Sequence, residues 1–139
     1  MALFLVGGDP APMYRGVAIV GAGHSRFGAF GVSAKRLFAD AAEECFASVD
    51  RDFERSRVRE AWIGTLGFGG GQLGEIAPLL CEHIGLKGMP AHRVENACAS
   101  SGFAFRNAVI AVRGGEAQIA LAGGVGGDSR GSCSRACTR

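Results

Sequence analysis

Four runs of apolar and small residues recur along the chain, at positions 16–23, 60–67, 91–97 and 117–124. Short runs of this kind, several of them rich in β-branched side chains, predict strands, because such side chains pack well on the surface of a sheet. The first run, GVAIVGAG, is apolar or glycine at every position. That pattern is typical of a strand buried on both faces of its sheet.

Between these strands, apolar residues recur at the three-to-four-residue spacing of helices. Ser33 predicts the start of a helix over residues 35–49, because its hydroxyl can accept from an unpaired backbone N–H group. A second helix is expected over residues 75–84, where Pro78 is tolerated only in the first turn. The third, over residues 100–113, is apolar around almost its whole surface.

Strands that alternate with helices predict an α/β fold with a mostly parallel sheet. A helix that is apolar nearly all round is typically buried, so the helix over residues 100–113 needs a covering layer on both sides. The chain offers too little sequence to supply both layers. We therefore expect part of a larger α/β domain with this helix in its interior.

Composition and charge argue against a membrane-spanning protein and against a nucleic-acid-binding protein. Hydrophobic residues make up 47% of the 139 positions, and 23 residues are glycine, a share well above the roughly 7% of average proteins. No run of about 18 apolar residues is present, so no membrane span is expected. The net charge of +2 comes from residues 127–139, while residues 50–60 carry four arginines and four acids. Such mixed charge indicates a solvated connection, and we expect no nucleic-acid partner.

Three segments differ in pattern. Residues 1–12 precede Met13, which looks like a more natural start, and they lack the basic residues of a signal peptide; we expect a non-native upstream extension. Residues 13–126 hold every predicted strand and helix. Residues 127–139 have no hydrophobic period. A disordered terminus is the ordinary interpretation, and our preferred hypothesis is that the reading frame is lost near Val125.

The five cysteines have no spacing typical of a disulfide framework, which favours a reducing, cytoplasmic setting. Cys45 and Cys81 lie on apolar helix faces and are expected to be core thiols. Cys133 and Cys137 form a C-x3-C pair without a second pair of ligands, so no metal site is predicted.

Cys98 is the candidate nucleophile. It stands between a predicted strand and the third helix, in the stretch RVENACASSGFAFRNAVIAV. Unpaired N–H groups and the positive end of the helix dipole favour a thiolate at such a place, and the same N–H groups can donate to an oxyanion. From the residues alone, an inert core cysteine is the commoner case.

This stretch resembles the nucleophile region of the thiolase family, above all the archaeal and sterol-carrier-protein-type acetyl-CoA acyltransferases. There an apolar strand, an A-C-A-S-[SG]-G box, a buried helix and a strand ending in A-G-G follow one another. VAIVGAGHSRFGAF is similar to the family's first strand and loop, and GTLGFGGGQLGEIAPLLCEHIGLKGMPAHRVE to the segment that leads to the nucleophile. The agreement covers about residues 14–125. It is more specific than the cysteine box alone, which ketoacyl synthases share in outline.

The resemblance implies the N-terminal portion of a thiolase-type acyltransferase, a half-domain with a buried nucleophile helix. Cys98 would take the acyl group of an acyl-CoA as a thioester, and its N–H group would supply half of one oxyanion hole. Coenzyme A would then cleave a 3-ketoacyl chain, or an acetyl-CoA carbanion would condense with the thioester. The resemblance also implies coenzyme A thioesters as substrates, no tightly bound cofactor, and a homo-oligomer in the full-length family.

The sequence departs from the family in its acid–base groups. The histidine box and the second cysteine of thiolases belong to a C-terminal half that has no counterpart here. His24, His83 and His92 do not stand in such a box, so we expect surface or structural roles for them. The 139 residues alone are therefore expected to have negligible thiolase activity.

Two glycine-rich stretches resemble nucleotide-binding motifs only in part. GAGHSRFG lacks the third glycine of a dinucleotide fingerprint, and GFGGGQLG lacks the Gly-Lys-Ser/Thr ending of a P-loop. A non-catalytic interaction or dimerisation remnant would expose an apolar patch. A ketoacyl or hydroxymethylglutaryl-CoA synthase relative would share the cysteine and differ in residues outside this sequence.

Overall fold

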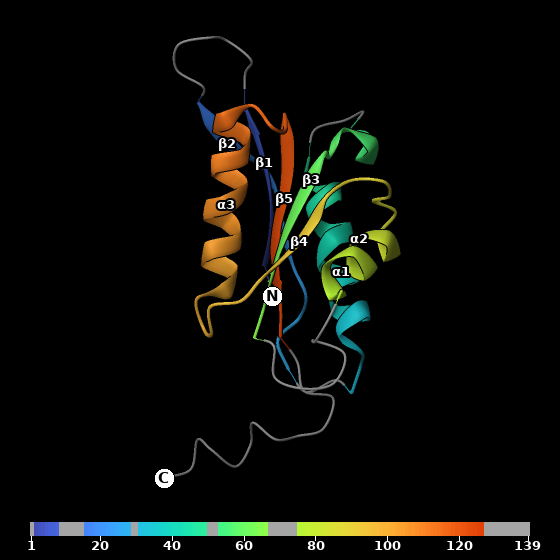
Figure 1. Ribbon diagram of the computed structural model, residues 1–139. Helices are drawn as coiled ribbons and strands as arrows, with labels where there is room; N and C mark the ends of the chain where they lie inside the picture. Colours follow the sequence, from blue (N-terminus) through green and yellow to red (C-terminus); the bar gives the residue numbers. More distant parts are fainter. Residues whose placement is uncertain (1, 9–15, 29–30, 50–52, 67–74, 127–139) are drawn as a thin grey trace.

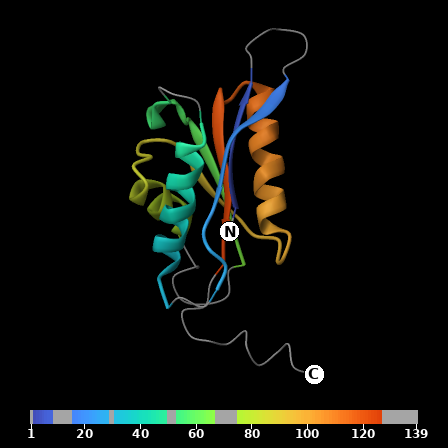
Figure 2. The same ribbon diagram turned by 180° about the vertical axis from the view of Figure 1, so that it is seen from behind.

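A five-stranded sheet separates two layers of helices in the computed structural model, with α3 on one face and α1 and α2 on the other (Figures 1 and 2). The structure describes residues 2–8, 16–28, 31–49, 53–66 and 75–126. The strands are β1 (Ala2–Gly8), β2 (Val17–His24), β3 (Glu60–Thr65), β4 (Ala91–Val94) and β5 (Ile119–Val125). The helices are α1 (Ala34–Ala47), the short 3-10 helix η1 (Arg55–Arg57), α2 (Ile76–His83) and α3 (Ser100–Gly114).

The strand order is β2-β1-β5-β3-β4. β3 pairs in parallel with β4 and β5, and β1 pairs antiparallel with β5 and β2. Every strand except β1 therefore points in the same direction, and the predicted α/β fold with a mostly parallel sheet is confirmed. The carboxyl ends of β3, β4 and β5 meet at one edge of the sheet.

No strand is predicted for residues 2–8, yet they form β1 in the interior of the sheet. Backbone pairing joins β1 to β5 on one side, beginning with Leu3 opposite Gly123, and to β2 on the other. Residues 2–8 pair with β2, which follows them in the chain, and with β5, which is distant in sequence; a local pattern does not reveal the pairing with β5. The interpretation of residues 1–12 as an upstream extension stays a prediction.

β2 is an edge strand, and most of its residues are exposed, so the prediction that residues 16–23 are buried on both faces is wrong. Ile19 and Val20 are exposed, and the buried positions within the strand are Gly21 and Gly23. α1 lies so close over these two glycines that a Cβ atom at either position would overlap it. Glycine in a strand permits this close approach of a helix.

The helices begin and end near their predicted positions. Ser33 caps α1, since its hydroxyl accepts the Arg36 N–H at 3.3 Å. Pro78 lies in the first turn of α2, as its missing N–H requires. α3 is followed by Gly115, whose φ of 84° is the left-handed conformation common at helix ends. None of the described helices combines the length and apolar character needed to cross a membrane.

The two faces of the sheet are packed differently. Large apolar side chains, among them Phe38, Ile63 and Leu80, fill the layer beneath α1 and α2. Cys45 and Cys81 are buried in this layer, which confirms their prediction as core thiols. The core beneath α3 is built mainly from small residues, namely Ala108, Val112, Ala117, Ala120 and Ala122. The larger side chains of Trp62 and Phe105 are only partly buried against this cluster.

α3 is buried only on the side that contacts the sheet. On its outer side, Phe103 is 44% exposed and Ile110 is 49% exposed. Among the described residues, no second layer covers this outer side, in agreement with the expectation for the helix over residues 100–113.

Arg55 of η1 joins three segments on the α1–α2 side. Its Nη2 lies 2.6 Å from Glu43 Oε2 of α1, and its Nη1 donates to the Ile84 carbonyl after α2 at 2.9 Å. The guanidinium also lies 4.4 Å from the centre of the Phe46 ring. The charged stretch over residues 50–60, as far as it is described, is therefore tied to the fold and is not only a solvated connection.

Candidate active site

Cys98 lies in a tight turn, residues 95–99, which joins β4 to α3 at one end of the sheet (Figure 1). The strand predicted over residues 91–97 is shorter than expected and ends at Val94. Cys98 is exposed and precedes the first residue of α3, Ser100, by two positions. The thiol is therefore placed just before the helix and not inside its first turn.

The turn has a strained backbone directly before Cys98. Ala97 has a φ of 46°, in the left-handed region that residues other than glycine rarely adopt. Glu95 Oε1 accepts the Ala97 N–H at 2.9 Å. The buried Ser100 hydroxyl accepts the Asn96 N–H at 2.8 Å and donates to the Ala97 carbonyl at 2.7 Å. These hydrogen bonds hold the turn on both sides of the strained residue.

The start of α3 adjoins Cys98. Among the described residues, no backbone carbonyl accepts from the N–H groups of Ser101 or Gly102, as is usual in a first helical turn. Such groups carry the positive end of the helix dipole, which stabilises a nearby anion. The start of α3 therefore offers N–H groups that could donate to an oxyanion close to the Cys98 turn.

Two glycines allow the start of α3 to lie against the sheet. Gly64 in β3 pairs with Gly124 in β5. A Cβ atom at Gly64 would lie 2.6 Å from backbone atoms of Ser100 and Ser101, and one at Gly124 would overlap the Ser101 side chain. Sequence reasoning missed this glycine pair, although glycine inside a strand is a general signal of close backbone approach.

The histidines are engaged elsewhere. His92 Nε2 of β4 lies 3.1 Å from Glu60 Oε1 of β3. His24 is the last residue of β2, and His83 is the last residue of α2. In the part of the chain that the structure describes, no imidazole or carboxylate forms a hydrogen bond with Cys98. These residues therefore do not provide a base next to the thiol.

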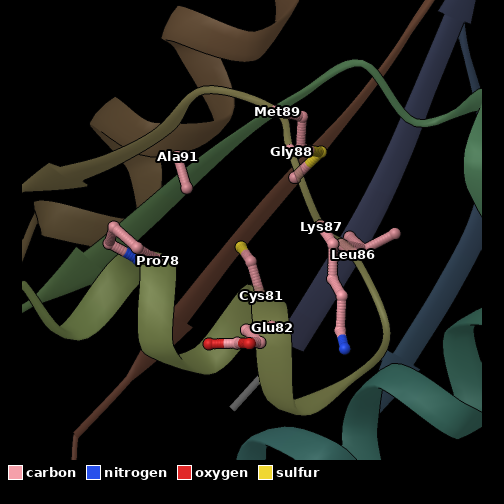
Figure 3. Close-up of a pocket in the computed structure, with 8 residues that line it drawn as sticks. All are labelled: Pro78, Cys81, Glu82, Leu86, Lys87, Gly88, Met89 and Ala91. Atoms are coloured by element: carbon pink, nitrogen blue, oxygen red, sulfur yellow. The ribbon is translucent and has the colours of Figure 1, made fainter.

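A pocket of about 290 Å³ lies beside α2 and β4, on the sheet face opposite α3 (Figure 3). It is lined by Pro78, Cys81, Glu82, Leu86, Lys87, Gly88, Met89 and Ala91. Burial raises the pKa of the Cys81 thiol to about 12. This thiol stays protonated near neutral pH and is a poor nucleophile, so the pocket does not offer a second site for acyl transfer.

Several predicted features lie outside the described residues. They are the glycine-rich loop over residues 67–74, the pair Cys133 and Cys137, and the whole tail over residues 127–139. Within the described ranges, no group of three or more His, Cys, Asp or Glu side chains is placed to hold a metal ion.

Comparison with known proteins places these observations in a family. Residues 17–134 match the family described as "Thiolase, N-terminal domain". The acetyl-CoA acetyltransferase of Methanocaldococcus jannaschii is 37% identical over 114 residues, which cover 80% of this chain and 28% of the relative. The acetyl-CoA acetyltransferase of Methanothermobacter thermautotrophicus is 34% identical over 113 residues, which cover 80% of this chain and 29% of the relative. Human sterol carrier protein 2 is 33% identical over 126 residues, which cover 89% of this chain and 22% of the relative.

The chain spans between 22% and 29% of the length of these relatives. The match nevertheless includes four of the five described strands, the three described α-helices and the turn that carries Cys98. The resemblance inferred from the nucleophile stretch is thereby confirmed. The chain belongs to the thiolase family, and the region it matches is that family's N-terminal domain.

Proposed function

We propose that this chain is the acyl-accepting part of a thiolase-type acyltransferase, with Cys98 as its nucleophile. The observation that carries the proposal is the position of Cys98, which is exposed in a hydrogen-bonded turn directly before α3. The relatives named acetyl-CoA acetyltransferase support acetyl-CoA as the acyl donor. The coenzyme A thioester is then a substrate, and the step needs no tightly bound cofactor.

In the proposed step, the Cys98 sulfur attacks the thioester carbonyl carbon of acyl-CoA. A new S–C bond forms while the carbonyl π electrons move to oxygen, and the Cys98 backbone N–H donates to the resulting oxyanion. When the oxyanion collapses, the bond from carbon to the coenzyme A sulfur breaks. Coenzyme A leaves with the proton that Cys98 released. The acyl group then passes to coenzyme A, or to an acetyl-CoA carbanion with formation of a C–C bond.

The second half of this cycle needs an acid–base group. None of the described imidazoles or carboxylates forms a hydrogen bond with Cys98, and the sequence has no counterpart of the family's histidine box. We therefore expect the 139 residues alone to form the acyl-enzyme slowly and to turn over acetoacetyl-CoA negligibly. A ketoacyl or hydroxymethylglutaryl-CoA synthase relative would share the first step and differ in the second. A homo-oligomer and a cytoplasmic setting stay predictions.

The experiment that tests the proposal is the detection of an acetyl adduct on Cys98. The purified chain is incubated with acetyl-CoA, digested and analysed by mass spectrometry. One acetyl group should appear on the peptide that contains Cys98 and should be absent from Cys98→Ala. Cys81→Ala is the matched control, because its buried thiol takes no part, and it should keep the adduct. A chain that iodoacetamide alkylates at Cys98 but acetyl-CoA leaves unmodified would contradict the proposal.

A non-catalytic interaction module is the second candidate function. The exposed Phe103 and Ile110 on the outer side of α3 favour it, because exposed apolar residues on one helix face suit contact with another apolar surface. Size-exclusion chromatography should then show self-association together with binding of a fluorescent apolar dye. Both should be lost in the Phe103→Ser/Ile110→Ser double variant. A monomer that binds no dye would exclude this function.

A further inference from the structure

We infer that Ser100 is a positioning residue that sets the direction of the Cys98 backbone N–H; this inference rests on the proposed acyl transfer. The Ser100 hydroxyl donates to the Ala97 carbonyl oxygen at 2.7 Å, and the Ser100 N–H donates to the same oxygen at 3.2 Å. That carbonyl and the Cys98 N–H belong to one peptide unit. Because the unit is planar and trans, fixing its carbonyl fixes its N–H in the opposite direction.

The Ser100 hydroxyl is itself held in place. Ser100 is 4% exposed, and its Oγ accepts the Asn96 N–H at 2.8 Å while donating to Ala97. A hydroxyl that accepts one hydrogen bond and donates another has a fixed rotation, and linked hydrogen bonds of this kind reinforce each other. The Ala97 N–H, which belongs to the preceding peptide unit, is held by Glu95 at 2.9 Å. The two peptide units that flank the Ala97 Cα atom are therefore each hydrogen-bonded, and the unit that carries the Cys98 N–H is held through its carbonyl.

This anchoring matters because Ala97 adopts a conformation that alanine disfavours. Without the Ser100 hydroxyl, the Ala97 carbonyl keeps only the longer bond from the Ser100 N–H, at 3.2 Å. The turn then relaxes more readily toward a commoner conformation, and the Cys98 N–H turns with its peptide plane. An oxyanion donor is effective only when it is aimed at the place where charge develops. Cys98 is exposed, so a change in the direction of its N–H leaves alkylation of the sulfur largely unaffected. Acyl transfer should therefore depend on Ser100 more strongly than alkylation, which forms no oxyanion.

The test compares two reactions of Cys98 in the full chain. Rates of acetylation by acetyl-CoA and of alkylation by iodoacetamide are measured for the wild type, Ser100→Ala and Ser100→Thr. We expect Ser100→Ala to lower the acetylation rate by about 10-fold or more, a part of the loss seen when an oxyanion donor is deleted, while alkylation changes by less than about 3-fold. Ser100→Thr keeps the hydroxyl and should acetylate within about 3-fold of the wild type.

Ser48 provides a matched control on the other side of the sheet. Its hydroxyl also accepts a backbone N–H, from Ala22 at 2.9 Å, and donates to a carbonyl, that of Cys45 at 2.7 Å. Ser48→Ala removes the same pair of hydrogen bonds far along the chain from Cys98. It should leave the ratio of acetylation to alkylation unchanged, which separates an effect on the Cys98 peptide from a general loss of stability.

The outcomes decide separately about the inference and about the proposed function. Equal loss of acetylation and alkylation in Ser100→Ala, or no loss in either, overturns the role of Ser100. A wild type that takes no acetyl group overturns the proposed function instead. Hydrogen exchange over residues 95–99 then still decides the inference, since exchange should accelerate in Ser100→Ala and not in Ser48→Ala.

A second variant covers the case in which Ser100→Ala does not fold, as judged by labelling of the buried Cys45 and Cys81. Ser100→Ala is then made together with Ala97→Gly, a change that favours folding because glycine adopts the φ of 46° freely. The double variant still lacks the Ser100 hydroxyl, so its acetylation should be at least about 3-fold slower than that of Ala97→Gly alone, at an unchanged alkylation rate. Equal acetylation of Ala97→Gly and the double variant would overturn the inference.

Discussion

Gly64 of β3 lies directly opposite Gly124 of β5, and both glycines contact the first turn of α3. Neither strand has a side chain at this point, so Ser100 and Ser101 lie against the sheet itself. Because neither glycine has a side chain, the start of α3, together with the Cys98 turn before it, can lie this close to the sheet. This relationship leads to the first prediction.

Gly64→Ala should lower the free energy of unfolding by about 1–3 kcal/mol, the usual cost of overpacking. The added methyl group would lie 2.6 Å from backbone atoms of α3, which cannot rotate away. Urea denaturation measures the change. Gly102→Ala is the matched control: it lies in the same turn with open space around it, and should be neutral or stabilising by about 0.5–1 kcal/mol. Equal effects of the two variants would contradict the close contact.

Iodoacetamide should distinguish the cysteines by their burial. In a chain with Cys133→Ser and Cys137→Ser, the exposed Cys98 should react within minutes, whereas Cys45 and Cys81 should react only after denaturation, because they are buried. Mass spectrometry of the digested protein gives the extent of labelling at each position. Labelling of the buried thiols before Cys98 would show that the turn is not arranged as described.

Stability should fall at alkaline pH because of Cys81. Burial raises the pKa of its thiol from 9.0 to about 12 in the folded state. Between these values the unfolded chain loses the thiol proton while the folded chain keeps it, so the free energy of unfolding falls by up to about 1.4 kcal/mol per pH unit. Below pH 9 both states are protonated and the contribution vanishes. Urea denaturation between pH 8 and pH 10.5 gives the free energy of unfolding at each pH. Its decrease with pH should be smaller in Cys81→Ala than in the wild type, and an equal decrease would refute this assignment.

Arg55→Ala should destabilise the fold by about 1 kcal/mol, because the arginine joins Glu43, the Ile84 carbonyl and the Phe46 ring, although solvent screens part of the ion pair. Arg55→Lys should not restore this stability, since one ammonium cannot replace the planar fork of donors. Thermal denaturation followed by circular dichroism measures both. Arg36→Ala, which breaks an exposed pair with Asp40, should cost about 0.5 kcal/mol or less. An equal cost for Arg55→Ala would indicate that Arg55 is only a surface residue.

Deletion of residues 1–8 should abolish cooperative unfolding. β1 is hydrogen-bonded to β2 and to β5, so its removal separates β2 from the rest of the sheet and leaves an unpaired edge on β5. Loss of the sigmoidal urea transition and the appearance of aggregates in size-exclusion chromatography are the expected results. A chain that ends at Gly126 is the control and should unfold as the full chain does. Normal folding without residues 1–8 would mean that β1 is dispensable.

The sequence by itself determined the elements that depend on neighbours along the chain. The hydroxyl of Ser33 and the apolar spacing after it defined α1, and Pro78 fitted the first turn of α2 as required. Cys98 was a candidate nucleophile for the same reason, since consecutive residues around it predict a transition from strand to helix. Caps, turns and periodicity act over a few positions, so local patterns suffice to predict them.

Only the tertiary structure decided which elements meet. It placed β1 between β2 and β5, left β2 at an edge, and brought Gly64 and Gly124 together beneath α3. It also showed that the Ser100 hydroxyl binds the Ala97 carbonyl, which shares a peptide plane with the Cys98 N–H. The unusual φ of Ala97 beside this plane cannot be predicted from a residue pattern. These features depend on contacts between segments tens of residues apart and on backbone geometry. The spacing of side chains along one chain carries little information about either.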